Sequence, residues 1–350
     1  MEIAGIPIEI HDLDRNAMED ARRRQASLTK PPGSLGLLEE ISVRLCGIKG
    51  EMTADLGGKV IILCAADHGV VEEGVSAYPQ EVTAQMLANF ADRGAAINVL
   101  AGYAGARVVL VDIGTVGEGS LPGVVDRRIR AGTANIAQGP AMSRKEAERA
   151  VATGIELAGQ EISGGAGMIA TGDMGIGNTT PSSALVAAFT GLPAEAVVGR
   201  GTGLDDTALD AKTRVVEKAL AANRPGSDDP VGALAGVGGL EIGAMAGVIL
   251  GGVMERVPVV IDGFISGAAA LLAERICPGA KNFMFASHLS EEPGHKAALD
   301  ELGLEPFINL NMRLGEGTGA ALAMPVIEVA LKLLNEMATF DEAGVSRESG

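Results

Sequence analysis

A carboxylate with a glycine on either side stands near the end of the chain, in the segment Arg313-Leu-Gly-Glu-Gly-Thr-Gly319. The segment follows the apolar run Phe307–Leu310 and precedes a long helical pattern, so Glu316 is predicted to lie at a helix N-terminus. Small neighbours leave this carboxylate sterically open, and the helix dipole favours its ionised form, as a general base requires. If the segment is taken alone, capping of the first helical turn by Glu316 is the simpler interpretation.

A glycine-rich segment, Gly172-Asp-Met-Gly-Ile-Gly-Asn-Thr-Thr180, follows a predicted strand and opens a helix that is predicted to begin near Pro181. Its glycines allow the backbone to approach an anion, and Asn178, Thr179 and Thr180 offer hydrogen-bond donors at the helix start. This combination is typical of a phosphate-binding loop, although an ordinary capped strand-to-helix turn uses the same residues. The spacing matches neither the Walker A motif nor the GxGxxG fingerprint.

A second glycine-rich segment, Gly199-Arg-Gly-Thr-Gly-Leu-Asp-Asp206, precedes a helix that carries Lys212. The favourable interaction of Asp205 and Asp206 with the dipole of that helix is enough to explain both residues. Lys212 lies about two turns into the helix. A solvated lysine is the usual interpretation of such a position, and a phosphate contact is the alternative.

A long polar loop, Asp67–Gln80, follows the first strong strand pattern and suits a lid or a binding loop. His68 in this loop invites a metal-binding interpretation, but the other histidines, His11, His288 and His295, give no HExxH or comparable ligand spacing. We therefore predict a structural role for His68 and no metal site. The sequence also lacks a GxSxG nucleophile elbow, so nucleophilic hydrolysis is not supported.

Short apolar runs rich in β-branched residues alternate with helical patterns along most of the chain. The predicted strands are Lys59–Ala66, Arg107–Asp112, Gly167–Thr171, Pro258–Asp262 and Asn282–Ser287. The predicted helices between them are Pro79–Ala101, Ser143–Leu157, Asp205–Ala222 and Ser266–Arg275. Alternation of this kind predicts an α/β fold with a mostly parallel sheet flanked by helices.

Polar and glycine-rich residues gather where the predicted strands end. In open sheets of this class ligands bind outside the carboxyl ends of the strands, so this edge is the predicted active site. The residues concerned are Asp67-His-Gly, Asp112-Ile-Gly, Gly172-Asp-Met-Gly, Asp262-Gly and Ser287-His.

Both ends of the chain have a charged helical pattern, over roughly the first thirty residues and over Ala320–Met337. We predict that residues 1–27 and 326–350 form a small helical domain, beside a large α/β domain over residues 28–325.

The composition excludes several classes of partner. The formal net charge of the 350 residues is −17, and a field of this sign repels nucleic acids and anionic membranes. Three cysteines without CxxC spacing and an acidic N-terminus without an export signal predict a cytoplasmic protein. The apolar stretch Gly236–Val253 is predicted to be a buried helix with Gly243, Gly247 and Gly251 on one closely packed face.

Taken together, these segments resemble the nicotinate-nucleotide–dimethylbenzimidazole phosphoribosyltransferase family. The ordered matches run through Leu28-Thr-Lys-Pro-Pro-Gly-Ser-Leu-Gly36, Ala66-Asp-His-Gly-Val70, Val75–Met86, Met174-Gly-Ile-Gly-Asn-Thr-Thr180, Gly199-Arg-Gly-Thr-Gly203, Val260-Ile-Asp-Gly-Phe264, Ser287-His-Leu-Ser290 and Arg313–Ala320. The resemblance implies a Rossmann-like α/β domain with a small helical bundle built from both chain ends. It also implies a homodimer in which the neighbouring subunit helps to close each active site.

The reaction that the resemblance implies converts nicotinate mononucleotide and 5,6-dimethylbenzimidazole, without a cofactor, into α-ribazole 5′-phosphate and nicotinate. Glu316 matches the family's catalytic glutamate, and Asp173 stands where the family pattern leads us to expect a glutamate. We predict that Glu316 is the general base, that Asp173 stabilises positive charge on the ribose, and that C1′ is inverted.

The resemblance also implies phosphate contacts from the 175–180 loop and Lys212, and a benzimidazole pocket near Ser76 and Gln85, while Tyr78 and Met174 are flat or apolar enough to sandwich the base. The full set of predicted substrate-binding residues is Ser76, Tyr78, Gln85, Met174, Gly175, Gly177, Asn178, Thr179, Thr180, Gly201, Lys212, Ser287 and Gly315. The alternatives are a nicotinamide-dependent oxidoreductase, which the missing GxGxxG fingerprint disfavours, and a non-catalytic nucleotide-binding protein.

Overall fold

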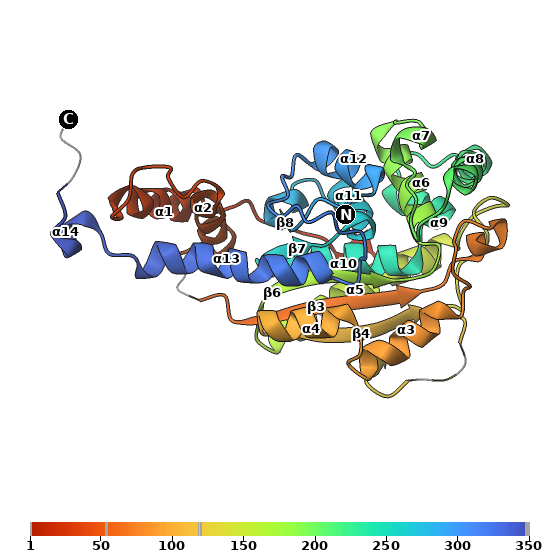
Figure 1. Ribbon diagram of the computed structural model, residues 1–350, viewed down its shortest axis with the longest axis horizontal. Coiled ribbons are helices and arrows are strands. Elements are labelled where there is room, and N and C mark those ends of the chain that lie inside the picture. The colour runs from red at the N-terminus through yellow and green to blue at the C-terminus, as the bar shows by residue number, and fades with distance from the viewer. Residues whose placement is uncertain (1, 53–54, 118, 120, 347–350) are drawn as a thin grey trace.

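Six parallel strands form the central sheet of the computed structural model, which describes residues 2–52, 55–117, 119 and 121–346 (Figure 1). Their order across the sheet is β5-β4-β3-β6-β7-β8. In chain order the strands are β3 (Gly58–Ala66), β4 (Ala106–Gly114), β5 (Val124–Asp126), β6 (Ala166–Met174), β7 (Val259–Ile261) and β8 (Met284–Ala286). All five predicted strands are confirmed, and within this sheet the three-residue edge strand β5 was not predicted.

The strand order reverses between β3 and β6, the two central strands. From β3 the chain builds outward through β4 and β5, and from β6 it builds outward in the other direction through β7 and β8. A reversal of this kind leaves a crevice at the carboxyl ends of the two central strands. Residues Val60–Ala66 of β3 are all buried, as expected of an apolar run covered on both faces.

Helices cover both faces of the sheet. The helices α3 (Val82–Ala91), α4 (Ala96–Ala104) and α13 (Thr318–Glu336) pack on one face, and α5 (Arg144–Ser163), α10 (Leu240–Met254) and α11 (Phe264–Ile276) pack on the other. A further layer lies beyond α10 and α11 (Figure 1). It contains α6 (Thr179–Thr190), α7 (Ala194–Val197), α8 (Asp206–Asn223), α9 (Pro230–Val237) and α12 (Pro293–Leu302).

The predicted helix Pro79–Ala101 was wrong as a single element. The structure has two helices there, α3 and α4, and the chain between them turns at Arg93, whose φ of 61° lies in the left-handed region. Gly94 follows directly, and its amide donates to the carbonyl of Asn89. The sequence contains no proline at this point, so the apolar pattern runs through the break without marking it.

The helix predicted within Gly236–Val253 is confirmed as α10, and every residue from Leu240 to Val253 is buried. Its glycine face packs closely against α5. A Cβ atom at Gly247 would lie 1.9 Å from the carbonyl oxygen of Val151, and one at Gly251 would lie 2.7 Å from the Cβ of Ala158. Glycine is therefore required at this helix crossing because the two backbones meet there.

Gly154→Ala, on the α5 side of the crossing, is expected to lower the free energy of unfolding by about 2–3 kcal/mol, as overpacking does. The added methyl would lie 1.9 Å from the carbonyl oxygen of Ala244, which belongs to a rigid helix and cannot move aside. The control is Gly159→Ala on the same helix, where no atom lies within 4 Å of the added methyl. Urea denaturation followed by circular dichroism measures both, and equal stabilities would contradict the close crossing.

Helices from the two end regions of the chain pack together beside the sheet (Figure 1). The helices α1 (Arg15–Ser27) and α2 (Leu37–Lys49) lie next to the distal half of α13, and α14 (Phe340–Ala343) follows at the far end (Figure 1). The guanidinium of Arg24 donates to the carbonyls of Leu334 and Asn335 at the end of α13, at 2.6 and 3.0 Å. The bundle also contains α2, which lies outside residues 1–27. The predicted division into residues 28–325 and the two ends stays a prediction.

The start of the chain differs from the expectation. The first residues are not helical, because β1 (Glu2–Ile3) and β2 (Ile6–Pro7) pair as an antiparallel hairpin, with β1 against α5.

Among the described residues α13 is the one helix that is long and apolar enough, by length and composition alone, to cross a membrane. Its apolar window is 56% buried inside the structure, as in a core helix.

Candidate active site

A cavity of about 530 Å³ opens at the carboxyl ends of the central strands. Loops from distant parts of the sequence line it, and most of the predicted site residues are among them. The predicted residues that line the cavity are Ser76, Tyr78, Asp173, Met174, Gly175, Gly177, Asn178, Thr179, Gly201, Gly315 and Glu316. The structure therefore brings both predicted catalytic carboxylates and both glycine-rich segments to one place.

Glu316 occupies a strained position on the cavity wall. Its φ is +65°, a left-handed conformation that is unfavourable for a residue with a side chain, and it lies between Gly315 and Gly317, which have φ values of +81° and +88°. Gly172 of β6 makes this path possible, since a Cβ atom there would lie 2.7 Å from the carbonyl oxygen of Glu316. Strain of this kind at a cavity wall is typical of a functional position.

The Glu316 carboxyl group is buried, with 5% of the residue exposed. Burial raises its pKa to about 7, and the negative charge of Asp262 adds to the increase, while a hydrogen bond from the backbone of Ile97 opposes it. A carboxyl group with this pKa exchanges a proton readily near neutral pH, which suits a general base. Simple helix capping does not explain the arrangement, because no side chain caps α13 and Glu316 precedes its N-cap residue, Gly317.

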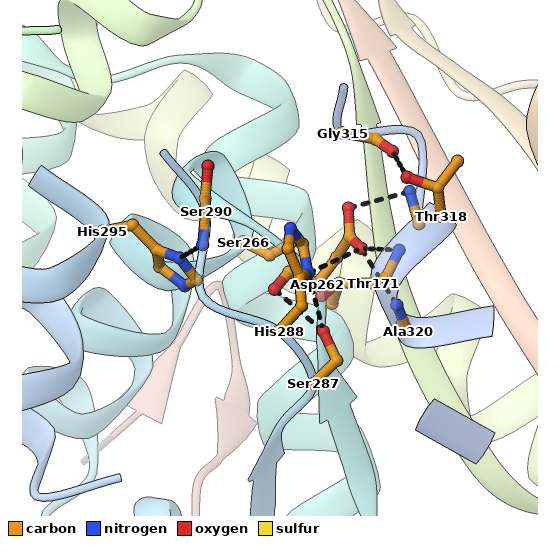
Figure 2. Close-up of polar contacts among 12 residues, drawn as sticks. Thr171, Asp262, Ser266, Ser287, His288, Ser290, His295, Gly315, Thr318 and Ala320 are labelled. Carbon is orange, nitrogen blue, oxygen red and sulfur yellow. Dashed lines mark hydrogen bonds and ion pairs between the residues drawn. The ribbon is translucent and has the colours of Figure 1, made fainter. Parts of the chain in front are cut away.

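Asp262, at the end of β7, holds the loop that carries Glu316 (Figure 2). One of its carboxylate oxygens accepts hydrogen bonds from the amides of Gly319 and Ala320, at 2.7 and 3.0 Å, and the other accepts one from Gly317 at 3.0 Å. These are amides at the start of α13, which have no partner within the helix. The C-terminal end of β7 thereby fixes the start of α13 and the residue before it.

His288 packs beside Asp262, with 4.0 Å between its Nδ1 and the nearer carboxylate oxygen. A Cβ atom at Gly319 would lie 1.9 Å from the same nitrogen, so the helix start is pressed against the imidazole. The predicted binding residue Ser287 lies behind this group and not on the cavity, because its hydroxyl donates to the carbonyl oxygen of Asp262 at 3.1 Å. Its observed contacts are those of a supporting residue.

Asp173 lies in the cavity wall near the Glu316 loop, where a Cβ atom at Gly315 would lie 3.1 Å from both carboxylate oxygens. The side-chain amide of Asn178 donates to one of these oxygens at 2.9 Å. Burial raises the pKa of Asp173 well above its usual value, and the charges of Asp262 and Glu241 raise it further. Burial and the neighbouring carboxylates therefore both oppose ionisation of Asp173.

The predicted phosphate loop runs from the end of β6 into α6. Gly175 is packed so tightly that a Cβ atom would lie 2.4 Å from the carbonyl oxygen of Ala66, and Gly177 has a φ of +88°. The helix begins at Thr179, slightly earlier than the predicted start near Pro181. Thr180 is fully buried and does not line the cavity. The open face of the loop is therefore formed by residues 175–179.

Lys212 is buried behind this loop, with 1% of the residue exposed. Its ammonium group donates to the hydroxyl of Thr179 at 2.7 Å and to the carbonyl of Gly199 at 3.0 Å. Burial lowers the pKa of Lys212 to about 8, although the negative charge of Glu292 opposes the decrease. The solvated position expected of a typical lysine is therefore not observed. Lys212 does not line the cavity itself, and its phosphate contact stays a prediction.

The apolar side of the cavity is formed by Val75, Tyr78, Val82, Met86 and Met174. Gln85, which we predicted in this pocket, is exposed on α3 and does not line it. The neighbouring Met86 takes that place because it lies one helical turn after Val82, on the face of α3 that meets the cavity. Ser76 is at the rim, where its hydroxyl accepts a hydrogen bond from the amide of Tyr78 at 3.1 Å.

His68 has a structural partner, as predicted. Its Nε2 lies 2.8 Å from a carboxylate oxygen of Glu241, and both residues are buried. Burial lowers the pKa of His68, but the charge of Glu241 and their hydrogen bond outweigh this effect, so that the pKa is raised overall. Within the residues that the structure describes, no three His, Cys, Asp or Glu side chains are grouped as metal ligands.

Among the cavity residues that were not predicted from the sequence are Phe264, Ile265, Ser290, Glu292, Arg313 and Leu314. Most of them lie within the motifs that carried the family resemblance or directly beside those motifs. Their position in those motifs is the signal that could have identified them.

Comparison with known proteins identifies the family of this chain. A phosphoribosyltransferase family model matches residues 10–345. The nicotinate-nucleotide–dimethylbenzimidazole phosphoribosyltransferases of Desulforamulus reducens and Desulforudis audaxviator are each 55% identical to this chain, over 97% and 99% of both sequences. The crystal structure of CobT from Thermus thermophilus is 52% identical, with a TM-score of 0.92 over 95% of this chain and 100% of that one. The chain belongs to the family of nicotinate-nucleotide–dimethylbenzimidazole phosphoribosyltransferases.

Proposed function

We propose that this enzyme transfers the 5-phosphoribosyl group from nicotinate mononucleotide to 5,6-dimethylbenzimidazole, giving α-ribazole 5′-phosphate and nicotinate. The observation that carries the proposal is that a buried carboxylate, Glu316, shares one cavity with a glycine-rich helix start at residues 175–179. The relatives at 55% identity are named for these two substrates. Neither the oxidoreductase nor the non-catalytic alternative agrees with the family to which the chain belongs.

The phosphate binds, in this proposal, at the start of α6. The amides of the 175–179 loop and the hydroxyl of Thr179 donate to its oxygens, and the helix dipole favours its negative charge. The ammonium group of Lys212 adds a positive charge directly behind Thr179. The net charge of the protein is negative, so this local arrangement supplies the attraction that the long-range field does not.

The acceptor base binds on the apolar side of the cavity. Dimethylbenzimidazole is flat and largely apolar, and the side chains of Tyr78, Met86 and Met174 provide matching surfaces. Glu316 lies on the wall of the same cavity. We propose that its carboxylate receives the proton from one ring nitrogen of the base while the other ring nitrogen attacks C1′ of the ribose.

A single displacement at C1′ replaces the bond to the pyridinium nitrogen with a bond to the ring nitrogen of the acceptor base. The ring nitrogen of the acceptor supplies an electron pair to C1′, and the bond from C1′ to the pyridinium nitrogen breaks with its electrons moving to nicotinate. The pyridinium thereby becomes a neutral ring, which reduces the need for an acid at the leaving group. Attack from the opposite face converts the β-nucleotide into an α-nucleotide, so we propose inversion at C1′.

Asp173 is proposed to respond to the nucleotide. Its pKa is raised by burial and by neighbouring carboxylates, which both oppose ionisation. A bound pyridinium cation opposes both effects, because a positive charge nearby favours the carboxylate. The anionic Asp173 then stabilises the positive charge that develops on the ribose as nicotinate departs.

We also propose a cytoplasmic homodimer. Val99 and Tyr103 lie one turn apart on α4 and are 70% and 83% exposed, and Val329 on the neighbouring α13 is 47% exposed. Apolar side chains grouped on a surface in this way favour burial against another protein. Analytical ultracentrifugation tests the dimer, and Tyr103→Asp is expected to shift it toward monomer.

Incubation of the purified enzyme with nicotinate mononucleotide and a panel of bases tests the proposed reaction directly. We expect release of nicotinate, detected by chromatography, and a new nucleotide whose anomer is assigned as α by NMR. Dimethylbenzimidazole should be accepted among the bases. Release of nicotinate without a new nucleotide, or a β-product, would contradict the proposal.

The turnover rate is expected to fall as the pH falls through about 7. Burial raises the pKa of Glu316 to about 7, and a general base acts in its unprotonated form. The rate should therefore be nearly constant above this pH and decrease roughly tenfold per pH unit below it. Measurement of kcat from pH 5.5 to 8.5 at saturating substrates checks this. A profile that stays flat down to pH 5 would indicate an ordinary exposed carboxylate.

A further inference from the structure

Glu292 is a buried carboxylate on the cavity wall that the proposed mechanism does not use. It lies just before α12, and 5% of the residue is exposed. One oxygen, Oε1, accepts a hydrogen bond from the amide of Gly201 at 2.7 Å. The other, Oε2, is buried and has no hydrogen-bond partner in the described structure. A buried carboxylate oxygen without a partner is costly and calls for an explanation.

Glu292 and Lys212 hold the same short segment, residues 199–201, from two sides. Lys212 donates to the carbonyl oxygen of Gly199, and Glu292 accepts from the amide of Gly201. Both contacts depend on glycine. A Cβ atom at Gly199 would lie 2.0 Å from Oε2 of Glu292, and one at Gly201 would lie 3.1 Å from Nζ of Lys212. The segment therefore lies between the carboxylate of Glu292 and the ammonium group of Lys212.

The charge of Glu292 acts on the Lys212 ammonium group. Both residues are buried, where the interaction of charges is stronger than in water. The hydrogen-bond partners of Lys212 in the described part of the chain are neutral, since its ammonium group donates to the hydroxyl of Thr179 and to a carbonyl. Other charged groups lie at the segment: Arg313 donates to the carbonyl of Gly201, and Arg200, within the segment, pairs with Asp206 on the exposed side.

We propose that Glu292 is a positioning residue for phosphate binding: it fixes the 199–201 segment and keeps the buried Lys212 ammonium group charged. This inference rests on the proposed function, because it assigns Lys212 to the phosphate of nicotinate mononucleotide. Burial alone lowers the pKa of Lys212 toward neutral pH, and a neutral amine does not attract phosphate. Glu292 counteracts that loss without contacting the nucleotide, through a segment that keeps the two charges apart.

The test is the affinity for nicotinate mononucleotide, measured by isothermal titration calorimetry between pH 6.5 and 9 without acceptor base. In the wild-type protein the affinity should fall as the pH rises through about 8, where Lys212 loses its proton. The phosphate stays dianionic over most of this range because its second pKa is near 6. Lys212→Arg should remove the decrease, since a guanidinium does not titrate in this range.

Glu292→Gln keeps an oxygen for the Gly201 amide and removes the charge. We expect affinity at pH 8 to fall by about 5–10-fold while the loss at pH 6.5 stays below about twofold, as a downward pKa shift of Lys212 requires. The control is Glu291→Gln, which removes an exposed charge from the adjacent position. An unchanged pH profile in folded Glu292→Gln, or an equal loss at both pH values, would overturn the proposal.

If Glu292→Gln melts too low to assay, Glu292→Asp takes its place. Its carboxylate stands one methylene farther from Lys212, so the decrease in affinity should move to lower pH by a smaller amount, and an unmoved decrease would overturn the proposal. Failure of the proposed function is distinguishable from this outcome. A wild-type protein that binds no nicotinate mononucleotide at any pH contradicts the function itself, whereas normal wild-type binding with identical variant profiles contradicts only the role of Glu292.

Discussion

Glu316→Gln is expected to lower kcat by roughly 10²–10⁴-fold, the range that removal of a general base typically produces. The amide has almost the same shape as the carboxyl group, so the strained loop between Gly315 and Gly317 should keep its path. It cannot accept the proton of the attacking base at neutral pH. The dissociation constant of nicotinate mononucleotide should change little, because the proposed phosphate loop lies elsewhere in the cavity wall and Lys212 is buried behind that loop.

Stopped-time assays of nicotinate release measure this effect, and calorimetric titration of the nucleotide provides the binding control. Glu305→Gln is a matched variant, since Glu305 is an exposed carboxylate outside the cavity lining. It should leave kcat unchanged. Turnover within a factor of about 3 of wild type in Glu316→Gln would show that another group, with Asp173 the nearest candidate, takes the proton.

The fold was predictable because its strands are apolar and short and its helices are marked by caps and charge. Ser143, for example, caps α5 with both partners of a capping box, Ser143 and Glu146. The break between α3 and α4 was not predictable, since it depends on the left-handed conformation of Arg93 and nothing in the residue types requires it. Local pattern therefore identified the elements and failed where tertiary packing bends the chain.

The site was predictable only where its residues lie in one segment. The predicted phosphate loop and the Glu316 segment are each contiguous, and the structure places both on the cavity. Gln85 shows the limit, because the family resemblance placed the segment around it in the pocket without indicating which face of its helix meets the cavity. The structure turns Met86 toward the cavity and leaves the neighbouring Gln85 exposed.

Contacts between distant segments could not be predicted at all. Glu292 meets Gly201 across 91 positions of sequence, and Arg313 meets it across 112. Periodicity and spacing in the sequence do not predict such pairs, and they do not predict the burial of Lys212 either. Lysines are mostly exposed, so residue type argued against the position that the structure shows.

Asp262→Ala is expected to reduce both stability and turnover, with a loss of about 3–5 kcal/mol in the free energy of unfolding. The carboxylate of Asp262 is fully buried and accepts the amides of Gly317, Gly319 and Ala320, which would all be left without their partner. Each buried donor without an acceptor costs on the order of 1–3 kcal/mol. Urea denaturation measures the loss, and Asp210→Ala, at an exposed position on α8, is the control.

Turnover in Asp262→Ala should fall further than the loss of folded protein explains. Asp262 fixes the start of α13 through these three amides, and Glu316 directly precedes the N-cap residue Gly317, so their release allows the proposed catalytic carboxylate to move. A displacement of about 1 Å is enough to cost roughly 10²-fold in rate. Assays at a temperature where the variant is fully folded separate the two effects. Normal kcat under those conditions would show that the strained glycines alone hold Glu316, and that Asp262 serves only to stabilise the fold.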